Sequence, residues 1–268
     1  AFAGPLLKVA RQQDVGGAGI HLQGDSSLGK TTALQVAASV WGSPENFCRT
    51  WNSTANGMEA TAASQNDTLL VLDEISECPP NEIGQIVYAL ANGQGKQRAR
   101  RTGGARDSAK WRVIALSSGE RSVQAHMAEG GGRPKAGQEV RLLNIPATGH
   151  KFGVFDCLHD HTTASGFADH LKRAVGRNHG HAGPAFVGHV IQTEEDLPTL
   201  YRNTCDLPQF AACDGVESRA ASIFALVGMA GKLATQYGLT GWAEGDSIEA
   251  AAGAFNDWKL CRGEGQTE

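Results

Sequence analysis

One stretch of sequence, Gly24-Asp25-Ser26-Ser27-Leu28-Gly29-Lys30-Thr31, matches the pattern G-x-x-x-x-G-K-[ST] at every specified position. Glycines at these positions let the backbone curl so that its N–H groups face phosphate oxygens at the start of a helix, whose dipole favours anions. In such a Walker A motif, or P-loop, we expect Lys30 to reach the terminal phosphates of ATP and the Thr31 hydroxyl to hold Mg²⁺. The predicted nucleotide-binding residues are Gly24, Asp25, Ser26, Ser27, Leu28, Gly29, Lys30, Thr31 and Thr32.

The residues around this motif predict alternating strands and helices. Residues 19–23 form a short apolar run before it, and residues 31–41 follow it with apolar side chains at helical spacing. Residues 68–74 and 111–120 contain continuous apolar runs, typical of strands buried on both faces of a parallel sheet. The predicted fold class is therefore α/β, a P-loop NTPase core with a parallel sheet. We also expect strands at 47–50 and 139–147 and helices at 56–65, 79–93 and 122–132.

Two acids, Asp73 and Glu74, close the apolar run that follows the motif. In nucleotide-binding folds of this class, the Asp holds hydrated Mg²⁺ and the adjacent Glu polarises the attacking water. We therefore predict Asp73 as a magnesium ligand together with Thr31, and Glu74 as the catalytic base. The pair favours ATP hydrolysis that drives conformational work over phosphoryl transfer to a small molecule. The lack of an NKxD-type motif disfavours a GTPase.

Two further catalytic assignments concern the later strands. The 111–120 run contains Ser117 and Ser118, and one of them, for which we choose Ser118, is expected to contact the γ-phosphate or the attacking water as sensor 1. The alternative is an ordinary serine at a strand end. Arg141, at the edge of the last strand, is predicted to act as an arginine finger in the site of a neighbouring subunit. The alternative is a surface arginine on an edge strand.

A basic insertion occupies residues 94–111. Residues 96–112 carry seven basic side chains and one acid, although the net charge of the whole chain is −4. Thr102-Gly103-Gly104 predicts a turn, and a protruding hairpin of this charge suits the phosphates of nucleic acid. The alternatives are a solvated loop, or a loop that donates arginines to a neighbouring nucleotide. The predicted nucleic-acid contacts are Lys96, Arg98, Arg100, Arg101 and Arg106.

The character of the sequence changes near residue 150. Histidine and glycine become frequent, so we expect two regions: an ATPase core over residues 1–150 and a mainly helical region over residues 151–268. The histidines at 159, 161, 179 and 181 lack metal-ligand spacing and are expected on loops or the surface. Helical patterns occur at 167–178, 184–191, 216–238 and 247–263.

Composition excludes several classes of protein. A chain of 268 residues with 41% hydrophobic and 19% charged residues is neither disordered nor collagen-like. No window of 18 apolar residues occurs, so we expect no membrane partner. Six scattered cysteines without a CxxC pair indicate reduced thiols and a cytoplasmic location. The chain begins without an initiator Met or signal-peptide pattern and ends abruptly, so we expect a piece of a longer protein.

Several stretches together resemble the domain of unknown function 927 family, ATPase modules of helicase-like and primase-associated proteins on phages, plasmids and integrated elements. The resemblance implies an AAA+-like core, similar to superfamily 3 and minichromosome-maintenance helicases, that works as a ring. In those relatives a hairpin before sensor 1 enters the central channel and tracks DNA, and residues 94–111 occupy that position here. Ser117-Ser118 replace the usual sensor Asn. The matching stretches are GDSSLGKTTALQVAASVWG, RTWNSTANGMEA, LLVLDEISE, YALANGQGKQRA, LSSGE, GQEVRLLNIPA, AGKLATQYGLTGW and WKLCRGEGQ.

The sequence therefore predicts a nucleic-acid motor that hydrolyses ATP with Mg²⁺. We expect a replicative DNA helicase module of a mobile genetic element, a homo-oligomeric ring acting on single-stranded DNA. The alternative is an ATP-dependent assembly or switch protein, an initiator or loader, that does not unwind processively. A third interpretation, a small-molecule kinase, fits the acid pair and the basic insertion poorly.

Overall fold

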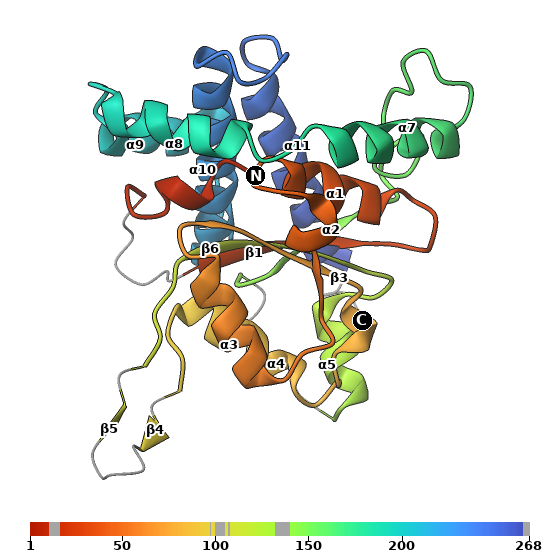
Figure 1. Cartoon of the computed structure of the whole chain (residues 1–268), viewed down its shortest axis with the longest axis vertical. Coiled ribbons are helices and arrows are strands. Elements are labelled where there is room, and N and C mark those ends of the chain that lie inside the picture. Colours follow the sequence, from red (N-terminus) through yellow and green to blue (C-terminus); the bar gives the residue numbers. More distant parts are fainter. Residues whose placement is uncertain (11–16, 97, 100–104, 107, 132–139, 265–268) are drawn as a thin grey trace.

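The computed structural model describes residues 1–10, 17–96, 98–99, 105–106, 108–131 and 140–264 (Figure 1). Its centre is a five-stranded sheet in which every strand pair is parallel, so the predicted α/β class with a parallel sheet is confirmed. Parallel pairing also places the carboxyl ends of all five strands at one edge. In spatial order the strands are β2 (Arg49–Thr50), β3 (Thr68–Asp73), β6 (Val113–Gly119), β1 (Gly17–Gln23) and β7 (Leu143–Pro146).

Helices cover both faces of this sheet, and the central strands feed two hydrophobic cores. In β3, Leu69 and Val71 face one core, whereas Leu70 faces the other. Successive side chains of a strand point to opposite faces, so a strand buried on both faces is a continuous apolar run. The first core includes α1 (Lys30–Ser39), and the second includes α3 (Ala55–Ser64), α4 (Ile83–Asn92) and α5 (Val123–Glu129).

Local signals set the helix ends, and two of them correct the predicted boundaries. The predicted helix at 79–93 begins only at Ile83, after a turn in which the Glu82 N–H donates to the Pro79 carbonyl over 2.9 Å; Pro79 itself precedes a proline, which disfavours helical geometry at that residue. Gly93 ends α4 in the left-handed conformation, with φ 66°. The predicted strand at 47–50 shortens to β2, because α2 (Pro44–Phe47) starts at a proline and ends at residue 47.

The last strand is also shorter than predicted. The expected strand at 139–147 is realised as β7, which begins only at Leu143; residue 139 lies outside the described residues. Among the described strands, β7 pairs only with β1, from Ile20↔Leu143 to Gln23↔Pro146. Pro146 has no N–H to donate, which fits an edge strand. Arg141 therefore precedes the strand instead of lying within it.

The described residues of the basic insertion include the two strands of a hairpin, which protrude from the body of the protein (Figure 1). Its strands, β4 (Arg98–Ala99) and β5 (Ala105–Arg106), pair antiparallel, with Arg98 opposite Arg106. At its base, Trp111 is buried and donates from Nε1 to the Leu90 carbonyl over 3.1 Å, which ties the hairpin to α4. Arg100 and Arg101 lie outside the described residues.

After residue 150 the described chain is mainly helical. Its helices are α7 (Ala164–Arg177), α8 (Ala182–Gln192), α9 (Leu197–Cys205), α10 (Gly215–Gln236) and α11 (Asp246–Glu264), of which the sequence patterns missed α9. Residues of α8 to α11 share one hydrophobic core with β1, β3 and β7. A division at residue 150 stays a prediction. No helix in the described part of the chain is long and apolar enough to cross a membrane.

Candidate functional site

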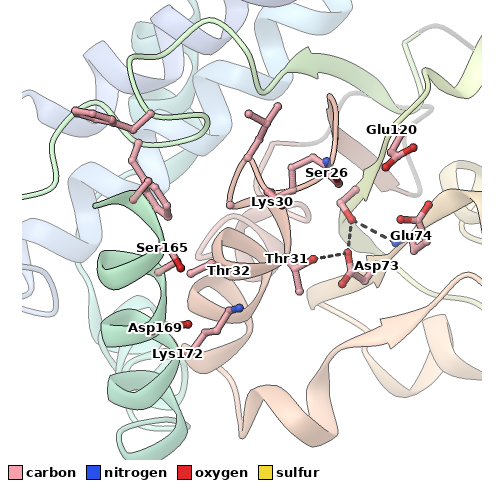
Figure 2. Close-up of a pocket in the computed structure, with 18 residues that line it drawn as sticks. Ser26, Lys30, Thr31, Thr32, Asp73, Glu74, Glu120, Ser165, Asp169 and Lys172 are labelled. Carbon is pink, nitrogen blue, oxygen red and sulfur yellow. Dashed lines mark hydrogen bonds between the residues drawn. The ribbon is translucent and has the colours of Figure 1, made fainter. Parts of the chain in front are cut away.

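A pocket of about 380 Å³ opens at the carboxyl edge of the sheet (Figure 2). Its walls come from the loop between β1 and α1, from the ends of β3 and β6, and from the segment that leads into α7. In open parallel sheets, ligands bind at this edge. The described residues that line the pocket are Ser26, Ser27, Leu28, Gly29, Lys30, Thr31, Thr32, Asp73, Glu74, Ser118, Glu120, Phe152, Phe155, Ala164, Ser165, Ala168, Asp169 and Lys172.

The loop of residues 24–31 leads from β1 into the pocket and depends on a glycine at its end. Gly29 adopts a left-handed conformation with φ 85° and directly precedes α1. A Cβ atom at this position would lie 2.8 Å from Phe155 Cε2. Gly29 is thus required both by the backbone turn and by the close packing of Phe155. The result is a helix whose N-terminal N–H groups lie at the pocket, a favourable place for an anion.

Lys30 lies over this loop. Its side chain is buried, and Nζ donates hydrogen bonds of 2.6 Å to the carbonyls of Gly24 and Asp25. Gly24 and Asp25 contribute to the site through these carbonyls, and neither residue lines the pocket itself. The loop therefore holds a buried ammonium group next to the helix N-terminus.

Asp73, at the end of β3, connects two hydroxyl groups (Figure 2). Its Oδ1 atom accepts a hydrogen bond of 3.4 Å from Thr31 Oγ1 and a second one from Ser118 Oγ. Ser118 Oγ in turn accepts from the Glu74 backbone N–H over 3.3 Å. The structure thus brings together Thr31, Asp73 and Ser118 from α1, β3 and β6.

Glu74 follows Asp73 and has an unusual backbone. Its φ of 57° lies in the left-handed region, which costs a residue with a Cβ atom roughly 1–2 kcal/mol. The Glu74 carboxylate accepts hydrogen bonds at Oε1 from the Ser76 hydroxyl, 2.6 Å away, and from the Ser76 N–H, 3.3 Å away. These two hydrogen bonds hold the carboxylate in place, and Glu74 lines the pocket.

A buried polar network lies beneath the pocket. His21 in β1 contacts Ser117 Oγ through Nδ1 and the Arg121 carbonyl through Nε2, both over 2.9 Å. A carbonyl only accepts, so Nε2 carries the hydrogen and Nδ1 accepts from Ser117. Trp51 Nε1 donates to the same Ser117 oxygen over 2.8 Å. Burial lowers the pKa of His21 to about 4, so the ring is neutral.

The opposite wall of the pocket was not predicted from the sequence. It consists of Phe152 and Phe155, in the segment after β7, and of Ser165, Asp169 and Lys172 on α7; Glu120, beyond β6, was missed as well. The segment contacts the loop directly, since the Val154 N–H donates to the Leu28 carbonyl over 2.9 Å. The α7 residues belong to no local motif, because they reach the site only through the packing of α7 near α1.

Arg141 and the hairpin lie away from this pocket. Arg141 precedes β7, at the amino end of the strand, and its guanidinium stacks 4.5 Å above the ring of Tyr88 on α4. The hairpin leads into the amino end of β6, and the Lys96 N–H at its base donates to Glu59 Oε1 over 3.2 Å. Arg141 and the described residues of the hairpin, Lys96, Arg98 and Arg106, therefore lie on the side of the sheet opposite the pocket.

Among the described residues no group of three or more His, Cys, Asp or Glu side chains is arranged to hold a metal ion. His161 and His170 lie with ring centroids 4.8 Å apart, and both belong to an aromatic cluster around Phe167. All six cysteines are free thiols.

Comparison with known proteins supports the fold. The family model of DUF927, a domain of unknown function, matches residues 1–110, which include the 24–31 loop and Asp73. No curated protein is significantly similar to the chain. Among solved structures, "SCCmec type IV Cch - active helicase" is similar, with a TM-score of 0.70 and 23% sequence identity. At this identity the similarity shows the fold alone.

The coverage of that similarity is unequal. It includes 96% of this chain but 45% of the helicase chain. This chain therefore spans less than half the length of the solved helicase. The fold similarity extends through the helices after residue 150, well beyond the part matched by the family model.

Proposed function

We propose that this chain is the P-loop ATPase module, AAA+-like, of an oligomeric nucleic-acid motor, a replicative helicase of a mobile genetic element. The observation that carries this proposal is the contact between Thr31 Oγ1 and Asp73 Oδ1, 3.4 Å apart, next to the buried Lys30 ammonium. The hydroxyl and the carboxylate that we assign to Mg²⁺ thus lie side by side at a helix N-terminus. The fold similarity to an active helicase and the protruding basic hairpin support the motor function.

The residues present fit a complex of Mg²⁺ and ATP. Thr31 and Asp73 offer a hydroxyl and a carboxylate oxygen, which are ligands that Mg²⁺ prefers. The pocket of about 380 Å³ falls within the range of small-molecule sites. When bound, Mg²⁺ neutralises charge on the phosphate oxygens. Lys30 exchanges the Gly24 and Asp25 carbonyls for terminal phosphate oxygens.

Glu74 is assigned as the general base. Ser76 binds Oε1, and we assign Oε2 as the atom that accepts a proton from the attacking water. The water oxygen bonds to the γ-phosphorus as the bond to the β–γ bridging oxygen breaks. Ser118 contacts both Asp73 and the Glu74 backbone, so it links the metal ligand to the base as a sensor of the γ-phosphate.

An ATP-dependent assembly protein, such as an initiator or loader, is the second candidate. The position of Arg141 at the sheet edge opposite the pocket fits this candidate as well as the motor, because both need an arginine that completes the site of a neighbouring copy. The two candidates differ in whether ATP turnover drives strand displacement. Unwinding that scales with ATP turnover supports the motor, and oligomerisation on DNA without unwinding supports the assembly protein.

The first test compares Glu74→Gln with wild type. We expect Glu74→Gln to bind ATP but to lose turnover by about 100-fold or more, because the base is removed while the phosphate contacts stay. Lys30→Ala should lose ATP binding. The measurement is ATP hydrolysis at low salt, with and without single-stranded DNA, at several protein concentrations, combined with calorimetric ATP binding.

Glu77→Gln is the matched control. Glu77 is exposed, lies three residues further along the same turn and does not line the pocket. It should behave as wild type. Equal turnover in Glu74→Gln and wild type would show that Glu74 is not the general base. A wild-type rate that does not change with DNA would contradict the nucleic-acid role of the hairpin. A rate that rises only linearly with protein concentration would contradict a site shared between copies.

A further inference from the structure

The pocket has two ends of different chemistry (Figure 2). Asp73, Glu74 and Glu120 lie at one end, and Ser165, Asp169 and Lys172 of α7 lie on the other side of the 24–31 loop (Figure 2). The first end carries the predicted metal ligands and the base. The second end carries the aromatic rings of Phe152 and Phe155 together with the small side chains of Ala164 and Ala168.

This polarity fixes the direction of a bound nucleotide. The reacting γ-phosphate must lie at the end with Glu74, and the loop and the start of α1 bind the phosphates that follow. Thr32, the second of the two threonines that follow Lys30, also lines the pocket, on the side of α7 (Figure 2). The ribose and the base must therefore extend from Thr32 toward α7.

The α7 wall is suited to this part of a ligand. No residue of α7 is fully buried, and Ser165 and Asp169 are exposed one turn apart on the side that lines the pocket. A carboxylate accepts hydrogen bonds from the adjacent hydroxyls of a ribose, and charge-assisted bonds of this kind are strong. The ring of Phe155 is fixed by an edge-to-face contact with Phe167, with centroids 5.1 Å apart, and offers an apolar surface to a base.

We propose that α7 and residues 152–155 form the nucleoside subsite of the pocket, in which Asp169 accepts hydrogen bonds from the ribose hydroxyls. The inference rests on the proposed function, because the phosphate end defines the direction. It assigns ribonucleoside triphosphates as the substrate class. It also gives the region after residue 150 a direct part in substrate selection.

The test measures binding by calorimetry in the full chain with Glu74→Gln, so that the ligands are not hydrolysed. The ligands are ATP, 2′-deoxyATP, 3′-deoxyATP and inorganic tripolyphosphate, each with Mg²⁺. Asp169→Ala should weaken ATP binding by roughly tenfold or more. It should change the affinity for tripolyphosphate by no more than about twofold, because that ligand has no ribose. The preference for ATP over the two deoxy ligands should disappear.

Arg173→Ala is the control, since Arg173 is exposed on the same helix and does not line the pocket. It should leave all four affinities unchanged. The inference is overturned if Asp169→Ala weakens ATP and tripolyphosphate alike, or weakens neither. If the Asp169-intact chain binds neither ATP nor tripolyphosphate, the proposed function itself fails, and the subsite falls with it.

Discussion

His21 illustrates how single residues support the site without entering it. It is fully buried, yet both ring nitrogens have partners, which removes the penalty of burying an unpaired polar group. Through Ser117 and the Arg121 carbonyl, the ring connects β1 to β6 and to the turn that carries Glu120. A protonated imidazole carries two N–H groups and needs an acceptor for each. The Arg121 carbonyl accepts one, but the Ser117 hydroxyl, which donates to Nδ1, would have to become an acceptor.

We therefore predict a stability that falls at acid pH. The pKa of His21 is lowered to about 4 in the folded chain, below the ordinary value of 6.5. Between these values the unfolded chain binds a proton that the folded chain does not, so the free energy of unfolding decreases as pH falls from 6.5 to 4. The contribution of His21 is on the order of 3 kcal/mol and is fully present above pH 6.5.

Urea unfolding of wild type and His21→Gln across pH 4 to 7.5 measures this contribution. The glutamine variant should be less stable at neutral pH and should lose less stability on acidification. Parallel curves for the two proteins would exclude His21 as the cause.

At the scale of elements, the segment after β7 holds the 24–31 loop in place. Gly153 has φ 76°, and a Cβ atom there would lie 2.3 Å from the Leu28 carbonyl oxygen. The Val154 N–H binds that same oxygen. The segment thus fixes the centre of the loop from outside, and its shape depends on one glycine.

Gly153→Ala should displace this segment. We expect a loss of about 2 kcal/mol or more in the free energy of unfolding, from the left-handed backbone and from the clash, and weaker ATP binding. Gly149→Ala is the matched control, because a Cβ atom there meets nothing within 4 Å. Thermal unfolding and calorimetric ATP binding of both variants decide the matter. Similar effects from the two substitutions would mean that the contact with Leu28 does not determine stability or ATP binding.

At the scale of the whole molecule, the sheet separates the candidate pocket from the predicted finger and the hairpin. The pocket lies at the carboxyl ends of the strands, whereas Arg141 and the hairpin lie near the amino ends of β7 and β6. Four residues of β7 at about 3.3 Å each separate these edges, so Arg141 cannot reach the pocket of its own chain. In the head-to-tail ring that we propose, Arg141 of one copy would lie at the pocket of the next.

Mixing two inactive variants tests this arrangement. Arg141→Ala and Lys30→Ala should each reduce ATP turnover by about 100-fold or more. In an equal mixture, a copy with an intact Lys30 can neighbour a copy with an intact Arg141, so turnover should recover to roughly a quarter of the wild-type rate. Arg219→Ala, an exposed arginine on α10, serves as the active control. If the mixture stays inactive while Arg141→Ala alone is inactive, the finger does not act between copies.

The sequence alone determined the parts of this protein that are local. The 24–31 loop is one contiguous stretch, and the acid pair lies at the end of a single strand. The phosphate-binding role that we propose for the loop needs successive backbone N–H groups, which a contiguous stretch supplies. The apolar runs likewise predicted a parallel sheet, because burial on both faces removes polar side chains from a strand. The sequence Thr102-Gly103-Gly104 with its basic flanks predicted a hairpin, and the described strands β4 and β5 pair antiparallel; residues 102–104 lie outside the described residues.

Only the tertiary structure decided which side chains meet across these elements. Ser117 and Ser118 are adjacent and chemically identical, but strand alternation sends Ser117 to His21 and Trp51, whereas Ser118 contacts Asp73. Asp169 joins the pocket because α7 packs near α1, more than a hundred residues away in sequence. Arg141 lies at the opposite edge because β7 starts late. Local patterns carry no information on such packing, since it depends on the summed burial of side chains from distant elements.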